Sequence, residues 1–123
     1  MSSPPGLRQR VYVGTMAELT SQRWLLAHLA PDAFGRPREA IVLLDESDEP
    51  RAYLNQCRHL PIPLDAGSRD FFFKGELQCS THGARYRLRD GMCVAGPCRG
   101  AALAALPIEI TTALVFVVDN GAR

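Results

Sequence analysis

The chain has 123 residues, of which 46% are hydrophobic and 22% charged, and its formal net charge is +1. This length and balance predict one soluble globular domain over residues 1–123, with little room for an elaborate active site. The near-neutral charge gives no electrostatic reason to expect nucleic acid or an anionic membrane as a partner.

The start of the chain bears on the cellular compartment of the protein. Residues 1–6 are rich in Ser, Pro and Gly, which predicts a flexible tail without the apolar segment of a secretory signal. The apolar stretches at 101–108 and 113–118 fall well short of the ~20 residues that cross a bilayer. We therefore expect a cytoplasmic protein, not bound to a membrane, whose cysteines stay mostly reduced.

The N-terminal third predicts a strand followed by helical structure. Residues 10–13 have the pattern of a short strand, and Thr15 with Glu18 fits a capping box, so a helical turn should begin there. Residues 20–30 carry apolar side chains at helical spacing, which favours a short helix, although the run also suits a buried strand. No second metal ligand lies near His28, which we interpret as a packed or half-exposed side chain.

From residue 40 onward the pattern is that of many short strands. An apolar run at 41–44, a charged turn at 45–50 and a partner strand at 51–55 predict a β-hairpin. Turns containing Gly or Pro separate the further strands, which are expected at 71–73, 77–79, 85–88, 107–110 and 114–118. The sequence therefore predicts an all-β fold, either an antiparallel β-sandwich or a partly open barrel.

Two short runs each combine a cysteine with a histidine. Cys57-Arg58-His59 and Cys79-Ser80-Thr81-His82 are 19 residues apart, and they use two of the three histidines and two of the four cysteines. In a reducing compartment such a mixture points first to a metal centre. The set suits a 2Fe–2S cluster with both cysteines on one iron and both histidines on the other. It also suits tetrahedral zinc, although zinc fingers usually pair like residues. The plainest alternative is buried cysteines and surface histidines without a metal.

The two runs resemble the signature of the Rieske iron–sulfur family. The resemblance covers residues 51–107 and continues after Gly83 through Tyr86, Asp90-Gly91, Gly96-Pro97 and Leu106-Pro107. It implies a Rieske-like fold with a small cluster-binding subdomain, made of two loops, at about residues 55–98. It also implies one 2Fe–2S cluster per chain, held by Cys57, His59, Cys79 and His82.

Departures from the family pattern bear on the reduction potential. High-potential Rieske proteins of cytochrome complexes direct a serine hydroxyl at a bridging sulfide and a tyrosine hydroxyl at a cysteine sulfur; the corresponding residues here are Ala84 and Tyr86. Those proteins also join their cluster loops by a disulfide, where this chain has Ile62 and Thr81. The resemblance is therefore to the soluble ferredoxin and oxygenase branch, and it implies a low to middling potential.

Two further cysteines, Cys93 and Cys98, flank Gly96-Pro97, in the loop that would cover the cluster. A redox disulfide or a substitute ligand is one interpretation. We favour two small, partly buried thiols in a turn. Replacing either by serine should then leave the visible spectrum intact.

The residues outside the two runs limit the chemistry. With His28 as the one remaining histidine, the chain cannot build the two-histidine, one-carboxylate iron site of a ring oxygenase. It also lacks a Gly-x-Gly-x-x-Gly run for a dinucleotide. We expect an electron carrier and no enzyme: a soluble ferredoxin between a reductase and a terminal oxidoreductase such as an oxygenase. The alternatives are a small Rieske subunit of a larger oxidoreductase, similar to that of assimilatory nitrite reductase, and a zinc-stabilised interaction domain.

Overall fold

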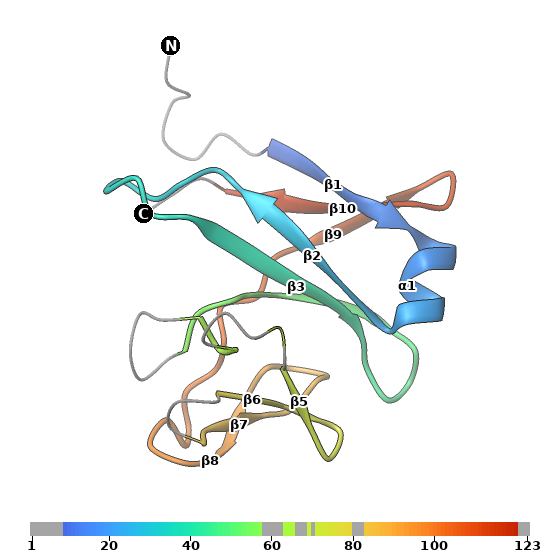
Figure 1. Cartoon of the computed structure of the whole chain (residues 1–123). Coiled ribbons are helices and arrows are strands. Elements are labelled where there is room, and N and C mark those ends of the chain that lie inside the picture. Colours follow the sequence, from blue (N-terminus) through green and yellow to red (C-terminus); the bar gives the residue numbers. More distant parts are fainter. Residues whose placement is uncertain (1–8, 58–62, 66–68, 70, 80–82, 121–123) are drawn as a thin grey trace.

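The computed structural model describes residues 9–57, 63–65, 69, 71–79 and 83–120. Within these ranges the chain forms ten strands and one short helix, and all strand pairs are antiparallel (Figure 1). The strands make three sheets with the orders β1-β10-β9, β2-β3-β4 and β5-β6-β7-β8. Their bounds are β1 Gln9–Thr15, α1 Met16–Gln22, β2 Trp24–Leu29, β3 Arg38–Leu44, β4 Pro50–Leu54, β5 Phe72–Phe73, β6 Glu76–Gln78, β7 Arg85–Tyr86, β8 Cys93–Ala95, β9 Ile108–Thr111 and β10 Leu114–Asp119. The predicted all-β fold is confirmed, and the sheets do not close into a barrel.

The central sheet β2-β3-β4 lies between two hydrophobic cores. The base core joins it to the β1-β10-β9 sheet and contains Leu19, Ala27, Leu29, Ala40, Val42, Leu44, Ala52, Val115 and Val117. The cluster-side core joins it to the small β5–β8 sheet and contains Ile41, Leu43, Tyr53, Cys57, Leu64, Phe71, Leu77, Cys79, Ala84, Tyr86, Cys93, Cys98 and Leu103. Successive residues of a strand point to opposite faces, so β3 supplies both cores. This is why its sequence is a continuous apolar run and does not alternate.

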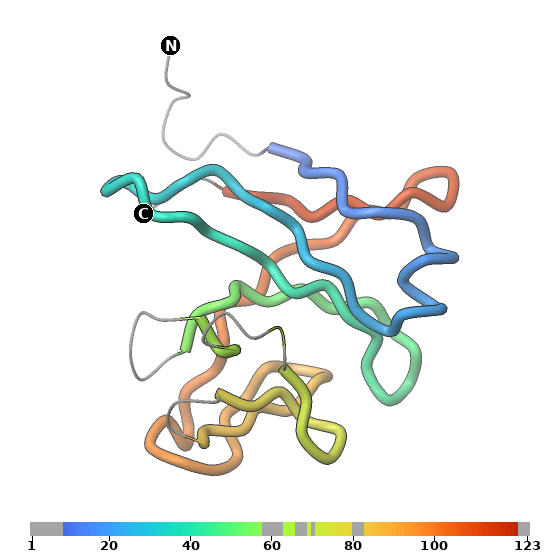
Figure 2. The backbone as a smooth tube through the Cα atoms, viewed as in Figure 1, coloured from blue at the N-terminus to red at the C-terminus, as the bar shows by residue number. Residues whose placement is uncertain are grey.

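The small sheet is an insertion between two strands of the larger framework. The chain leaves β4, forms β5 to β8 and returns to β9 (Figure 2). On its way back it pairs with β4, where the backbone of Leu54 donates to Ala104 O and that of Leu106 donates to Ala52 O. The insertion is therefore fastened at both of its ends to the central sheet.

The segment 20–30 differs from its predicted short helix. The helix α1 ends at Gln22, and residues 24–29 form β2, paired with β3 along its whole length. Trp24 and Leu26 pack on the cluster-side core, while Leu25, Ala27 and Leu29 pack on the base core. The local pattern did not indicate this strand, because a strand with two buried faces has no simple alternation of polar and apolar residues. Its pairing partner β3 also lies outside the local sequence.

The capping box at the start of α1 is confirmed. The backbone N–H of Glu18 donates to Thr15 Oγ1 at 3.0 Å, and the backbone N–H of Thr15 donates to Glu18 Oε1 at 2.9 Å. Arg23 ends the helix in the left-handed conformation. Among the described residues this helix, seven residues long, is the only one, and no helix there is long and apolar enough to span a bilayer.

Candidate metal centre

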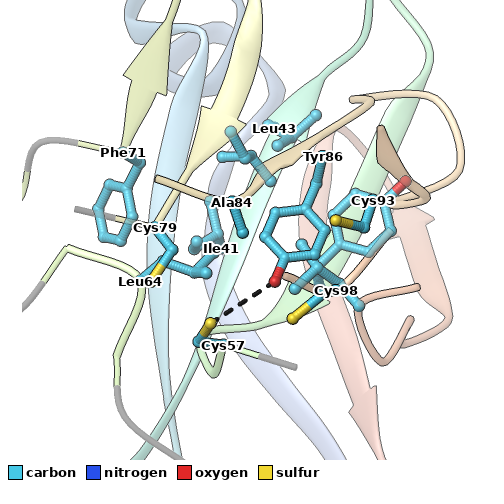
Figure 3. Packing of buried hydrophobic residues seen from close by; sticks show 13 residues of the cluster. Ile41, Leu43, Cys57, Leu64, Phe71, Cys79, Ala84, Tyr86, Cys93 and Cys98 are labelled. Carbon is cyan, nitrogen blue, oxygen red and sulfur yellow. Dashed lines mark hydrogen bonds between the residues drawn. The ribbon is translucent and has the colours of Figure 1, made fainter. Parts of the chain in front are cut away.

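The two cysteines of the predicted centre are buried at the ends of strands. Cys57 follows β4 and is 3% exposed, and Cys79 directly follows β6 and is fully buried. Both side chains lie in the cluster-side core, close to Leu64 and Tyr86 (Figure 3). His59 and His82 lie outside the described residues. The structure therefore brings the two sulfurs into one apolar, water-shielded region.

The second cysteine loop is closed by two backbone hydrogen bonds. The N–H of Cys79 donates to Ala84 O at 2.8 Å, and the N–H of Gly83 donates to Cys79 O at 2.8 Å. Gly83 has a φ of +71°, in the region that favours glycine. Glycine at this position allows the turn between β6 and β7 to close immediately after the motif.

Tyr86 directs its hydroxyl at the first cysteine. It lies on β7 between Leu77 of β6 and Cys93 of β8, and its side chain is fully buried. Its Oη is 3.6 Å from Cys57 Sγ (Figure 3). The position predicted for Tyr86 is confirmed. A thiolate on Cys57 has no proton, so in that state the tyrosine donates and the sulfur accepts.

A third loop packs against the second. Gly96 has a φ of +93°, and a Cβ added there would lie 2.7 Å from Ala84 Cα. Real side chains do not approach so closely, so only glycine fits between the two backbones. The Gly96-Pro97 segment is thus fixed directly beside the loop that carries Cys79.

Cys98, in this third loop, also lies in the cluster-side core. It is 7% exposed. Burial raises the pKa of the Cys98 thiol, the nearby Tyr86 opposes this, and the nearby Cys57 raises it further. Cys93 is also buried, but its Sγ donates to Ala95 O at 3.2 Å. The two thiols are more deeply buried than predicted.

A polar network anchors the first cysteine loop to the central sheet. Asn55 Oδ1 accepts the backbone N–H of Leu64 at 2.9 Å, and Asp65 Oδ2 accepts that of Arg69 at 2.8 Å. Both guanidinium Nη atoms of Arg69 donate to the Glu39 carboxylate on β3, each at 3.0 Å. Burial raises the pKa of Glu39, but hydrogen bonds from Arg69 and Asn55 outweigh it and hold the pKa below its usual value. No sequence pattern predicts this network, because Glu39 is far from its partners in the chain.

The third histidine is exposed on the central sheet. His28 is on β2 with its side chain 75% exposed, and its Nδ1 is 3.5 Å from Glu39 Oε2. It is therefore a surface residue, where the sequence predicted a packed or half-exposed one.

The donor set of the described residues fits one end of an iron–sulfur cluster. Cys57 and Cys79 offer two sulfurs, which iron in such clusters prefers. The site around them is apolar, and the Tyr86 hydroxyl, 3.6 Å from the Cys57 sulfur, can donate a hydrogen bond to it. Donors of this kind stabilise a charged sulfur and would not compete with it for iron.

The sequence model of the Rieske [2Fe-2S] domain matches residues 15–112, a range that includes both Cys/His runs and the Gly-Pro loop. The chain belongs to this family. As a Rieske domain it binds one 2Fe–2S cluster, whose chemistry is one-electron transfer. Family membership decides between the alternatives of the sequence analysis, in favour of the cluster and against zinc.

Solved structures of Rieske proteins share the fold. The plasma membrane Rieske protein PetC3 of the cyanobacterium Synechocystis PCC 6803 is 23% identical with a TM-score of 0.66, and the match covers 87% of this chain and 97% of that one. The ferredoxin of carbazole 1,9a-dioxygenase from Nocardioides aromaticivorans IC177 is 25% identical with a TM-score of 0.60, covering 94% of this chain and 99% of that one.

A part of a larger protein has the same fold. The terminal oxygenase of carbazole 1,9a-dioxygenase from Novosphingobium sp. KA1 is 19% identical with a TM-score of 0.61; 96% of this chain matches 31% of that one. No curated protein sequence matches this chain. The Rieske domain therefore resembles both free-standing proteins and a domain of an oxygenase.

Proposed function

We propose that Cys57 and Cys79 bind one iron of the cluster and that His59 and His82 bind the other. The observation that carries this proposal is the shared burial of the two cysteine side chains, with the Tyr86 hydroxyl 3.6 Å from the Cys57 sulfur. The spacing of each histidine after its cysteine supports the rest of the set.

We further propose that the chain is a soluble, cytoplasmic ferredoxin that carries single electrons from a reductase to a terminal oxidoreductase such as an oxygenase. The likeness to the ferredoxin of carbazole 1,9a-dioxygenase, which covers 99% of that ferredoxin, supports the carrier role. The sequence supports a carrier without substrate chemistry, because His28 cannot build a second iron site alone.

The bound cluster supplies the redox chemistry by accepting and releasing one electron. The residues of the chain set the conditions for this step. The cluster-side core keeps water from Cys57 and Cys79, and the Tyr86 hydroxyl donates to the Cys57 sulfur. A donor to the sulfur withdraws negative charge, which favours the reduced form and raises the potential. The Arg69–Glu39 pair joins the segment after the first cysteine run to β3.

A test of the ligand set uses the full chain and one variant for each ligand. The pure protein should be red-brown, contain two irons and two sulfides, and give an electron paramagnetic resonance (EPR) signal only after reduction. Serine at Cys57 or Cys79 should abolish this signature, as should asparagine at His59 or His82. A colourless protein with one zinc, or a full signature after any of the four changes, would contradict the assignment.

The matched controls are His28→Asn and Cys93→Ser. Each removes the same type of side chain from a position outside the proposed ligand set, so each should retain the cluster. Circular dichroism separates loss of the cluster from loss of the fold.

The carrier role and its alternative, a small subunit of a larger oxidoreductase, differ in assembly. A carrier is a monomer in gel filtration, and a separately added flavoprotein reductase with NADH reduces it. A permanent subunit is isolated from its source in a stable complex with a large partner, and it is reduced within that complex.

A further inference from the structure

The charges of the chain are divided unevenly between the two ends of the molecule. Residues 71–103, which contain the small β5–β8 sheet, carry five Arg or Lys residues and two Asp or Glu residues. The rest of the chain carries nine and eleven, since the totals are 14 and 13. The small sheet forms one end of the molecule and the β1-β10-β9 sheet the other (Figure 1). One end of a nearly neutral protein is therefore basic.

An exposed aromatic ring lies among the cations of this basic end. Phe73, the last residue of β5, is 40% exposed. The Nζ of Lys74 is 5.4 Å from the centroid of the Phe73 ring, and the Cζ of Arg85, on β7, is 5.9 Å from it. At up to ~6 Å a cation and an aromatic face attract each other. Phe73, Lys74 and Arg85 make one surface, which we call the Phe73 face.

The backbone turns the Phe73 ring outward. A two-residue turn at Lys74 and Gly75 joins β5 to β6, and both residues have a positive φ, of +50° and +80°. Turns of this kind match the twist of a hairpin. Successive side chains of a strand point to opposite faces, and the preceding residue, Phe72, packs on the cluster-side core. The pairing that buries Phe72 therefore exposes Phe73.

The cations of the Phe73 face are only weakly paired within the chain. Arg87, elsewhere on the same sheet, makes a close salt bridge of 2.6 Å to Asp90. In contrast, Arg85 Nε is 3.7 Å from Glu76 Oε1. Lys74 makes no salt bridge to an acidic side chain within the part of the chain that the structure describes. Positive charge on this face is thus available to a partner outside the chain.

The Phe73 face adjoins the loop that carries a proposed iron ligand. Arg85 pairs with Gln78, the residue directly before Cys79. The backbone N–H of Cys79 donates to the carbonyl oxygen of Ala84, the residue directly before Arg85, at 2.8 Å. A protein bound to this face therefore lies beside one of the cluster loops, where an electron donor or acceptor has to approach.

We infer that the Phe73 face is a docking site for an acidic surface of a redox protein. Aromatic and Arg side chains are enriched at protein interfaces, where the ring is buried and the cations pair with carboxylates. Opposite charges accelerate the encounter of two proteins and orient them, and salt weakens this effect. The inference rests on the proposed carrier function, to which it adds the place of docking and the charge of the partner.

Two haem proteins of opposite surface charge serve as probes, the acidic cytochrome b5 and the basic cytochrome c. The reduced protein is mixed with each ferric cytochrome in a stopped-flow instrument; the cluster loses one electron and the haem iron gains it. The rate constant with cytochrome b5 should fall about tenfold between about 20 and 300 mM NaCl, and that with cytochrome c should not fall. Isothermal titration calorimetry of the oxidised protein with cytochrome b5 measures the affinity without electron transfer.

A pair of double variants separates the Phe73 face from the total charge. Lys74→Gln/Arg85→Gln removes two charges from the face. Arg10→Gln/Arg36→Gln removes two charges from exposed positions outside the small sheet. The first variant should lower both the affinity for cytochrome b5 and the low-salt rate constant about fivefold, and the second should change them less than about twofold.

A second pair of variants tests the aromatic ring. Phe34 is the matched control for Phe73, because it is 80% exposed and its ring lies 5.1 Å from the Arg36 guanidinium carbon. Phe73→Ala should weaken binding of cytochrome b5 about threefold, and Phe34→Ala should leave it unchanged. Circular dichroism and iron content check the fold and the cluster of each variant, and the charge variants test the face independently if Phe73→Ala fails to fold.

The possible results distinguish this inference from the carrier function. Equal effects of the two charge variants, or a rate with cytochrome b5 that does not depend on salt, overturn the docking site. A dimer in gel filtration that Lys74→Gln/Arg85→Gln dissociates would assign the face to a second copy of the chain, and this also overturns the inference. A wild-type protein that reduces neither cytochrome contradicts the carrier function instead, and calorimetry then still decides whether the Phe73 face binds an acidic surface.

Discussion

Two buried tyrosines differ in the group that their hydroxyl contacts, and this difference decides which of them can act on the cluster. The Tyr86 hydroxyl is 3.6 Å from the Cys57 sulfur, whereas the Tyr53 hydroxyl donates to the backbone oxygen of Leu88 at 2.6 Å. Burial raises the pKa of Tyr53 to about 12, so this residue stays a neutral donor. Only the first tyrosine contacts a proposed ligand, so only the first should act on the redox centre.

Replacing Tyr86 by phenylalanine should lower the midpoint potential of the cluster by about 60–130 mV. A hydrogen bond to a charged acceptor contributes about 1.5–3 kcal/mol, and ~1.4 kcal/mol corresponds to about 59 mV for one electron. Protein-film voltammetry measures the shift. Tyr53→Phe is the matched control, since it loses a buried hydroxyl away from the sulfurs; equal midpoints for the two variants would refute the role of Tyr86.

At the scale of elements, local signals were reliable where a turn or a cap is made by neighbouring residues. The capping box of Thr15 and Glu18 forms as the sequence predicts. The hairpin of β3 and β4 also forms, and its turn is built on Asp45. The Asp45 carboxylate accepts the backbone N–H groups of Ser47 and Glu49 at 2.8 and 3.0 Å. Local signals were misleading for β2, whose pairing with β3 depends on residues farther along the chain.

The Asp45 turn makes the stability of the fold sensitive to acid. Burial raises the pKa of Asp45, but the N–H groups of Glu49 and Ser47 and the guanidinium of Arg51 outweigh it, so the pKa is below its usual value. A carboxyl with a lowered folded pKa stabilises the fold above its unfolded pKa of about 3.9, and this contribution is lost as the pH falls through the folded value. The free energy of unfolding should therefore decrease below about pH 4.

Asp45→Asn tests this dependence by urea denaturation between pH 3 and 7. The variant should be about 1–3 kcal/mol less stable at pH 7, since it loses the charged acceptor, and it should lose less stability on acidification than the wild type. Asp48→Asn removes an exposed carboxylate of the same turn and serves as the control. Parallel pH profiles for Asp45→Asn and the wild type would show that Asp45 is not responsible.

At the scale of the whole molecule, a buried ion pair connects two of the three layers. The guanidinium of Arg38, on β3, makes two hydrogen bonds of 3.1 and 3.2 Å to the carboxylate of Asp119, at the end of β10. The Asp119 side chain is 3% exposed. Together with the base core, this pair joins the outer sheet to the central sheet that supports the cluster loops.

Arg38→Ala should lower the free energy of unfolding by about 3 kcal/mol, because it leaves a buried carboxylate without its guanidinium. Denaturant titration measures the change. Arg36→Ala breaks an exposed pair with Asp32 and should cost less than about 1 kcal/mol. Similar losses in the two variants would contradict a special role of the buried pair.

The sequence by itself determined the chemistry of the centre and the class of the fold. The Cys/His runs, the Gly-Pro loop and most of the short strands are patterns of residue types at short, fixed spacings. Such patterns can be recognised in the sequence without knowledge of the fold. The tertiary structure decided that residues 24–29 form a strand and that Arg69 binds Glu39. It also decided that Gly96 packs directly on the backbone of Ala84. These features depend on contacts between segments far apart in the chain, and packing alone brings such segments together.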